Sequence, residues 1–212
     1  FGPPCAVMRD LGKAVIEAAR DFVGGLPHPI PILACHLHFV KDIGKDLLRA
    51  SHDDLRGLFR RFKILPRLRG LARDLGRGLG TDIVEARRDL AAWLQSAEEP
   101  LLFPKGTAGL AVVRALTQWV LDYPSDGTDA GFPFDRPYLD LYRRGHRAGR
   151  AAESLLRNPD VDLRTQQALK RLRRHLEPLR SELPFQAPVR ILDTRAHLFD
   201  ELRHAVRLQA KP

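Results

Sequence analysis

Two short apolar runs near the start of the chain constrain its fold more than any other feature. The first run, CAVM at residues 5–8, leads to Asp10, and the second, ILAC at residues 32–35, leads to His36. Between them, apolar residues recur at helical spacing over residues 11–22, and Gly24-Gly25 stops the pattern. A strand, a helix and a strand joined by so short a crossover predict a parallel, right-handed unit.

Residues with chemically active side chains stand where both predicted strands end. Asp10 closes the first strand, and Cys35, His36 and His38 close the second and open a new helical pattern. Functional groups gather at the carboxyl ends of parallel strands, so this edge is the first candidate site. Without further information, an Asp between a strand and a helix is more often a helix N-cap than a metal ligand.

The group formed by Cys35, His36 and His38 allows two interpretations. Thiolate and imidazole are the usual zinc ligands, and a C-x-x-H spacing can hold one metal ion. A structural zinc site needs four ligands, however, and nothing in the sequence requires Cys5 to supply another. We favour a packed Cys and a hydrogen-bonded His that brace the site. A Cys-His hydrolase would also need an oxyanion hole that the sequence does not place.

From residue 51 onward the chain shows helical periodicity and no convincing strand. We expect Ser51 to cap a new helix, a helix to begin near Pro137, and Pro184 and Pro188 to break the chain before the last helix. The expected fold class is an α/β fragment plus a mainly α part. Residues 1–50 would form the α/β part, and residues 51–212 the helical part.

The strongest local charge signal lies between residues 56 and 73, where seven residues are basic and none is acidic. One interpretation is a solvated helix face, because charge runs are often only surface. The other is a surface that contacts phosphates, because the guanidinium fork can bind a phosphate through two N–H groups. The basic residues are Arg56, Arg60, Arg61, Lys63, Arg67, Arg69 and Arg73.

Aromatic and basic residues mark four further segments. Phe132-Pro133-Phe134 reads as an aromatic plug that anchors an irregular loop, and Trp93 and Trp119 read as core residues. A helix over residues 163–180 carries an apolar stripe and a basic face. This helix fits a hairpin arm and a nucleic-acid-facing helix equally well.

The whole chain is basic, with 35 Lys and Arg against 26 Asp and Glu and a net charge of +9. This balance favours polyanionic partners. The chain shows no secretory signal and no apolar run long enough to span a bilayer, and its two Cys residues do not form a disulfide framework. We therefore expect a cytoplasmic protein without a membrane partner.

The order of these motifs resembles a known family. An Asp that ends a strand, then a helix, then a strand ending in C-H-x-H before an amphipathic helix resembles the middle of DDE transposases with a ribonuclease-H-like catalytic domain, especially the mutator-like and related bacterial ones. In that family a C-x-x-H pair follows the second acidic residue, and here the pair is Cys35 and His38. The resemblance covers residues 4–48 and, more weakly, the FPFDRPYLDLYRR stretch from Phe132.

The resemblance implies that residues 1–50 are a partial ribonuclease-H-like βαβ core and residues 51–212 a helical insertion region. It implies that Asp10 is the second of three carboxylates that hold Mg²⁺, or Mn²⁺, for DNA cleavage and strand transfer. The first Asp and the last Glu would lie outside this chain, which we expect to be an internal fragment, inactive alone. DNA is the implied partner, and self-association stays open. The alternative is a non-catalytic, Arg-rich helical module that binds nucleic acid or a partner helix.

Overall fold

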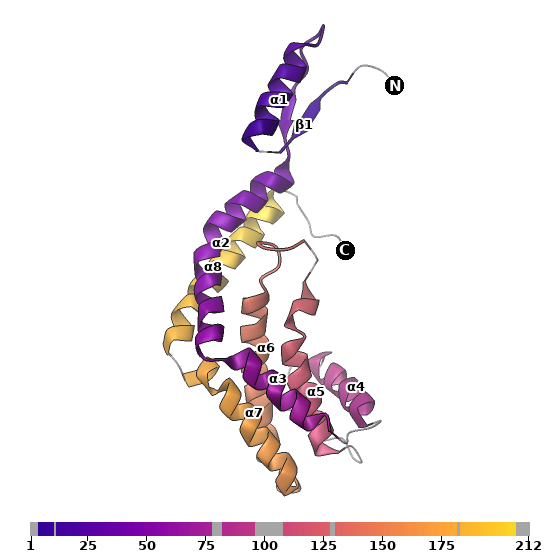
Figure 1. Cartoon of the computed structure of the whole chain (residues 1–212), viewed down its shortest axis with the longest axis vertical. Helices are drawn as coiled ribbons and strands as arrows, with labels where there is room; N and C mark the ends of the chain where they lie inside the picture. Colours follow the sequence, from indigo (N-terminus) through magenta and orange to yellow (C-terminus); the bar gives the residue numbers. More distant parts are fainter. Residues whose placement is uncertain are drawn as a thin grey trace. The chain divides into compact units, whose positions relative to one another are not determined.

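The computed structural model describes residues 4–10, 12–77, 82–95, 108–127, 130–181 and 183–206, and most of them are helical (Figure 1). A small pair of strands and a large helical part were both expected, and both are confirmed. The elements, in chain order, are β1 (Val7–Arg9), α1 (Lys13–Gly24), β2 (Ile32–Ala34), α2 (His36–Arg61), α3 (Ile64–Leu75), α4 (Asp82–Gln95), α5 (Gly109–Leu121), the 3-10 helix η1 (Tyr123–Asp126), α6 (Pro137–Leu155), α7 (Leu163–Ser181) and α8 (Leu183–Ala205).

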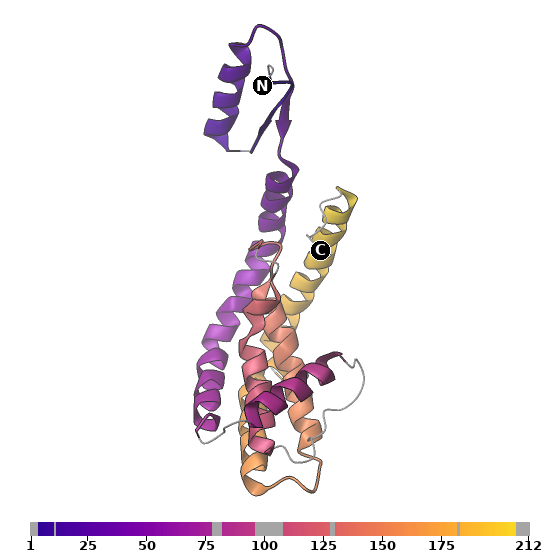
Figure 2. The same cartoon turned by 90° about the vertical axis from the view of Figure 1, so that its right-hand side faces the viewer.

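The strand–helix–strand unit forms as the sequence predicted. β1 and β2 pair in parallel, with Val7 opposite Ile32 and Met8 opposite Leu33. Helix α1 lies against this pair (Figure 2) and ends at Gly24, and the backbone N–H of Gly25 bonds to carbonyls of its last turn. Met8 and Leu33, side by side in the register, are 69% and 45% exposed. This sheet face is therefore apolar and open, whereas parallel sheets are usually covered on both faces.

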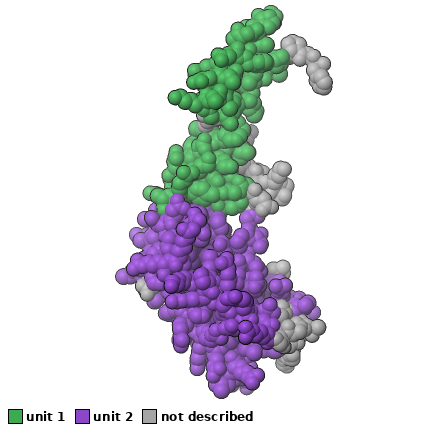
Figure 3. Space-filling view, in the orientation of Figure 1, with its two compact units in different colours: residues 1–50, 128–135, 193–212 green, residues 51–127, 136–192 purple. Residues whose placement is uncertain are grey.

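The chain divides into two compact units (Figure 3). Unit 1 holds residues 1–50, 128–135 and 193–212, and unit 2 holds residues 51–127 and 136–192. The expected boundary at residue 50 coincides with one of these divisions. The predicted helical region of residues 51–212, however, contributes two segments to unit 1.

The expectation that Ser51 caps a new helix is wrong. Helix α2 runs from His36 to Arg61 without a break, and Ser51 lies inside it, only 6% exposed. The cause is an apolar stripe that continues on both sides of Ser51, with Leu48 before it and Leu55 after it fully buried. A continuous stripe at helical spacing outweighs the cap preference of a short polar sequence.

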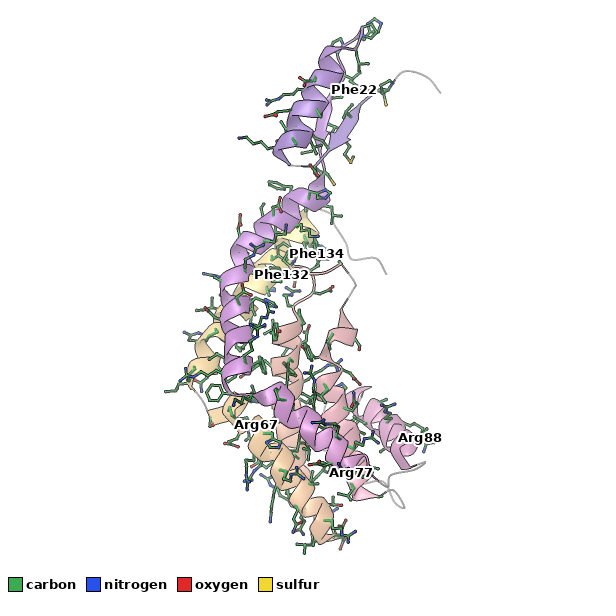
Figure 4. All side chains as sticks on the ribbon, viewed as in Figure 1. Phe22, Arg67, Arg77, Arg88, Phe132 and Phe134 are labelled. Atoms are coloured by element: carbon green, nitrogen blue, oxygen red, sulfur yellow. The ribbon has the colours of Figure 1, made fainter. Side chains whose placement is uncertain are left out.

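Within unit 1, the first part of α2 packs against the second part of α8. A Cβ atom on Gly44 would lie 2.5 Å from the Phe199 ring and 2.5 Å from Pro133, so only glycine fits there. Phe134 (Figure 4) is 9% exposed. It packs on Phe199 with ring centroids 5.8 Å apart. The predicted aromatic plug is therefore confirmed for Pro133 and Phe134, while Phe132 is only half-buried.

Within unit 2, α5 packs against α3, α4, α6 and α7. Trp93 of α4 and Trp119 of α5 meet edge to face, with ring centroids 6.3 Å apart. Both rings are half-buried, so the expected core position is confirmed only in part, and the rings lie at the margin of the core. Arg147 and Arg144 cover them, at 4.6 Å and 5.1 Å from the respective ring centroids.

Pro188 does not break the chain as expected, because it lies inside α8. Pro184 occupies the first turn of the helix, where backbone N–H groups have no intrahelical partner in any case. Pro188 follows one turn later and removes a single intrahelical hydrogen bond.

Across the parts of the chain that the structure describes, no helix is both long and apolar enough to cross a membrane.

Candidate functional site

Asp10 and Cys35 occupy neighbouring positions at the carboxyl edge of the two strands. The last paired residues are Arg9 in β1 and Ala34 in β2, so Asp10 and Cys35 each come directly after them. The backbone N–H of Cys35 donates to the carbonyl oxygen of Arg9 over 2.7 Å and extends the ladder by one step. The parallel register thus brings together Asp10 and Cys35, two of the candidate site residues identified from the sequence.

The carboxylate of Asp10 orients the entry to α1 without capping the helix. Its Oδ1 accepts the backbone N–H of Gly12 over 2.9 Å, and Gly12 itself is the N-cap residue. Such side-chain-to-backbone turns are common for Asp. A Cβ atom on Gly12 would lie 3.0 Å from the same oxygen, which makes glycine the best fit at this close approach. One carboxylate oxygen therefore has a structural partner, and Oδ2 is the oxygen that a metal ion could use.

The described residues do not form a complete metal site around Asp10. In residues 4–10, 12–77, 82–95, 108–127, 130–181 and 183–206, no three side chains of His, Cys, Asp or Glu gather closely enough to hold a metal ion. A two-metal site of the expected kind takes several carboxylates. Asp10 offers one carboxylate of the kind that such a site uses.

Cys35 stands at the start of α2 and interacts with His38 one turn further on. Hydrogen bonds from the backbone N–H and the side chain of His38 lower the pKa of the Cys35 thiol. A thiol at a helix N-terminus next to an imidazole is a known setting for a stabilised thiolate. Cys35 is half-buried, and His36 and His38 are exposed.

The bracing interpretation expected Cys35 and His38 to be largely buried beside the strand of Asp10. This expectation is wrong for His38, because β2 ends at Ala34 and the C-H-x-H segment opens α2 at the surface of its unit. The thiol then faces the unpaired N–H groups of the first helical turn. The segment forms the N-terminal turn of α2, in which His38 hydrogen-bonds to the Cys35 thiol.

The seven basic residues of the 56–73 run are all exposed, but they do not share one face. Lys63 adopts a left-handed conformation with φ 52°, which turns the chain between α2 and α3. Arg56, Arg60 and Arg61 therefore belong to the end of α2, and the others follow the turn. Arg56 and Arg61 also lie near aromatic rings, 5.9 Å from the Tyr138 centroid and 5.7 Å from the Phe62 centroid.

Helix α3 separates its three arginines further. Residues 67 and 69 project about 200° apart around a helix, whereas residues 69 and 73 project about 40° apart. Arg67, at the start of α3 (Figure 4), lies near His175 of α7, whose pKa is lowered by burial and by the charges of Arg67, Arg171 and Arg174. Arg69 and Arg73 lie on the side of α5.

Arg69 and Arg73 meet Arg114 of α5 in a hollow of ≈ 680 Å³. We call it the arginine hollow, and Pro66, Ala72, Gln118 and Leu121 complete its lining. Sequence reasoning missed Arg114. A signal was present, because Arg114 is the sole charged residue of the otherwise mostly apolar helix Gly109–Leu121, and a lone charge in such a helix needs a reason.

A second, larger hollow of ≈ 960 Å³ lies between α6 and α7. The predicted basic face of α7 contributes Lys170, Arg173 and Arg174 to it, while Leu172 and Leu176 of the apolar stripe are buried. Acidic residues also line this hollow. They are Glu177 and Glu153, and Glu153 pairs with Arg180 over 2.9 Å.

Comparisons of the chain with protein-family models, with curated proteins and with solved structures found no match. The functional interpretation therefore rests on the residues and their geometry.

Proposed function

We propose that this chain is the central part of a DDE transposase, which cleaves DNA and transfers its strands with the help of divalent metal ions. One observation carries the proposal: Asp10 directly follows β1 and stands beside Cys35, which directly follows β2 and precedes α2. Cys35, the first member of the C-x-x-H pair, thus stands next to the acid in space as well as following it in the sequence. This arrangement supports the order of motifs that resembles the family.

Asp10 would contribute a carboxylate to the metal site through Oδ2. The hydrogen bond from Gly12 to Oδ1 holds the carboxylate in place before any metal arrives. When bound, a pair of divalent ions activates the attacking oxygen and stabilises the leaving oxygen. Two further carboxylates are required for this chemistry, and the described residues do not place them near Asp10.

The test replaces Asp10 with Asn in the protein encoded by the complete reading frame that contains this chain. Asn keeps an oxygen for the Gly12 N–H, so the turn and the fold should survive while the charge is lost. We expect magnesium-dependent cleavage of the element's end DNA to disappear. Paramagnetic broadening by Mn²⁺ around residue 10 should disappear as well, which reports metal binding independently of activity. Cleavage at the wild-type rate would exclude Asp10 as a metal ligand.

The second candidate is a non-catalytic helical module that binds nucleic acid through arginine. The exposure of all seven basic residues of the 56–73 run favours it. The two candidates differ in what the complete reading frame encodes. A strand-borne Asp upstream and a helix-borne Glu downstream would support the transposase, and their absence would support the binding module.

A further inference from the structure

We propose that the arginine hollow binds a phosphate group of a nucleic acid backbone, held by Arg69, Arg73 and Arg114. The inference rests on the nucleic acid partner of the proposed function, but it does not depend on catalysis at Asp10. It also selects two residues from the 56–73 run and adds one that the run does not contain.

The three arginines converge because two packed helices carry them. Arg69 and Arg73 lie one turn apart on the same side of α3, and Arg114 projects from α5. Both helices are anchored by buried apolar residues, among them Leu68 in α3 and Val113 in α5. The walls of the hollow are thus parts of the packed core of unit 2, and an anion would meet guanidinium groups from two directions.

No acidic residue lines the arginine hollow among the residues that the structure describes. Asp74, next to Arg73 in the chain, binds Arg171 of α7 over 2.7 Å. Asp122, which follows Leu121, has its Oδ1 bonded to Nε2 of Gln118 over 2.7 Å. Three positive charges around one hollow repel each other, and a bound anion between them offsets this repulsion. The hollow is therefore complementary to a group with several negatively charged oxygens.

Arg114 also has a structural role, which the experiment must separate from binding. A Cβ atom on Gly76, the C-cap of α3, would lie 3.1 Å from Cζ of Arg114. The guanidinium thus sits over the carboxyl end of α3, where the helix dipole favours a positive charge. This position explains why Arg114 can remain close to Arg73 before an anion binds.

The chemistry of the lining favours phosphate over a nucleobase. Arginine forks bind phosphate oxygens through paired N–H groups. The lining contains no aromatic side chain among the described residues, and a base would need one on which to stack. Pro66 and Leu121 offer apolar contact for a sugar. The hollow between α6 and α7 is larger, but Glu153 and Glu177 already balance part of its charge.

The first experiment measures binding of a fluorescent DNA oligonucleotide by anisotropy at several salt concentrations. It compares the whole chain with the triple variant Arg69→Gln/Arg73→Gln/Arg114→Gln. The control variant Arg143→Gln/Arg157→Gln/Arg164→Gln removes the same number of charges from exposed positions outside the hollow. We expect the hollow variant to bind about tenfold more weakly or worse. Its slope of log affinity against log salt should fall by about one for each phosphate that is no longer neutralised.

Equal losses of affinity in the two triple variants would overturn the proposal, because only net charge would then matter. Arg114→Lys guards against a folding artefact, since Lys keeps the positive charge over α3 but loses the fork. This variant should melt like the wild type and still bind DNA more weakly. Wild-type affinity in Arg114→Lys would remove Arg114 from the site.

Inorganic phosphate distinguishes a nucleic acid backbone from a free phosphate. Followed by changes in the NMR signals around the hollow, it should bind weakly, and DNA should displace it. Tight phosphate binding without displacement by DNA would overturn the backbone assignment. The anisotropy experiment is made without divalent metal ions, so its outcome does not depend on Asp10. A cleavage-competent Asp10→Asn protein would therefore defeat the proposed catalytic role and leave this site standing.

Discussion

The guanidinium of Arg144 in α6 lies over the ring of Trp119 in α5, 5.1 Å from its centroid, and donates an N–H to the carbonyl oxygen of the same residue. Trp119 belongs to the last turn of α5, where carbonyl groups have no intrahelical partner. Arg144, only 8% exposed, satisfies one of them and brings a positive charge to the negative end of the helix. This interaction joins two helices of the core of unit 2.

Replacing Arg144 with Met should destabilise unit 2 by about 2 kcal/mol, because it removes both a buried charged hydrogen bond and a cation–π interaction. Urea unfolding measures the effect. Tryptophan fluorescence can follow the unfolding of unit 2, because Trp93 and Trp119 both lie in it. The neighbour Arg143 is exposed, so Arg143→Met should change stability by less than about 0.5 kcal/mol. Equal effects at the two positions would contradict the structural role of Arg144.

Two glycines of α2 should respond to alanine in opposite directions. Gly44→Ala places a Cβ atom 2.5 Å from both Phe199 and Pro133, two rigid rings, and should cost about 1–3 kcal/mol through overpacking. Gly57 has open space around it, so Gly57→Ala should stabilise the helix by about 0.5–1 kcal/mol. Hydrogen exchange of α2 amides and thermal melting by circular dichroism measure both changes. A neutral Gly44→Ala would mean that α2 and α8 are packed less closely.

Cys35 should react with iodoacetamide at lower pH than an ordinary cysteine thiol. The partner His38 lowers the pKa of the Cys35 thiol, so the reactive thiolate is present at lower pH and the rate–pH curve shifts to the acid side. In His38→Ala the backbone hydrogen bond remains and the imidazole is lost, so the curve should move part of the way back. The measurement is peptide mass spectrometry of alkylated protein over a pH series.

The same preparation tests the zinc interpretation of Cys35 and His38. If stoichiometric zinc protects Cys35 from alkylation and disappears in Cys35→Ala, then Cys35 is a zinc ligand and does not merely hydrogen-bond within the first turn of α2. Without zinc, Cys35→Ala should cost only about 1 kcal/mol, the size of a small truncation or a missing cap.

Local sequence patterns predicted several elements of the fold correctly. The period of the apolar residues and the glycines after them predicted the strand–helix–strand unit, and Pro137 marked the start of α6. The adjacency of Asp10 and Cys35 also followed from sequence, because a short crossover makes the two strands parallel and brings their ends to one edge. These features depend on residues close together in the chain, so a linear pattern contains them.

Only the tertiary structure decided which distant residues meet. The sequence presented residues 56–73 as one basic run, but the turn at Lys63 and the helical phase of α3 sent Arg67 towards α7 and Arg69 and Arg73 towards Arg114. Ser51 looked like a cap until buried neighbours on both sides fixed it within a longer helix. In each case the outcome depends on which helix packs where. That choice is made by apolar contacts between segments far apart in the chain, which no local spacing encodes.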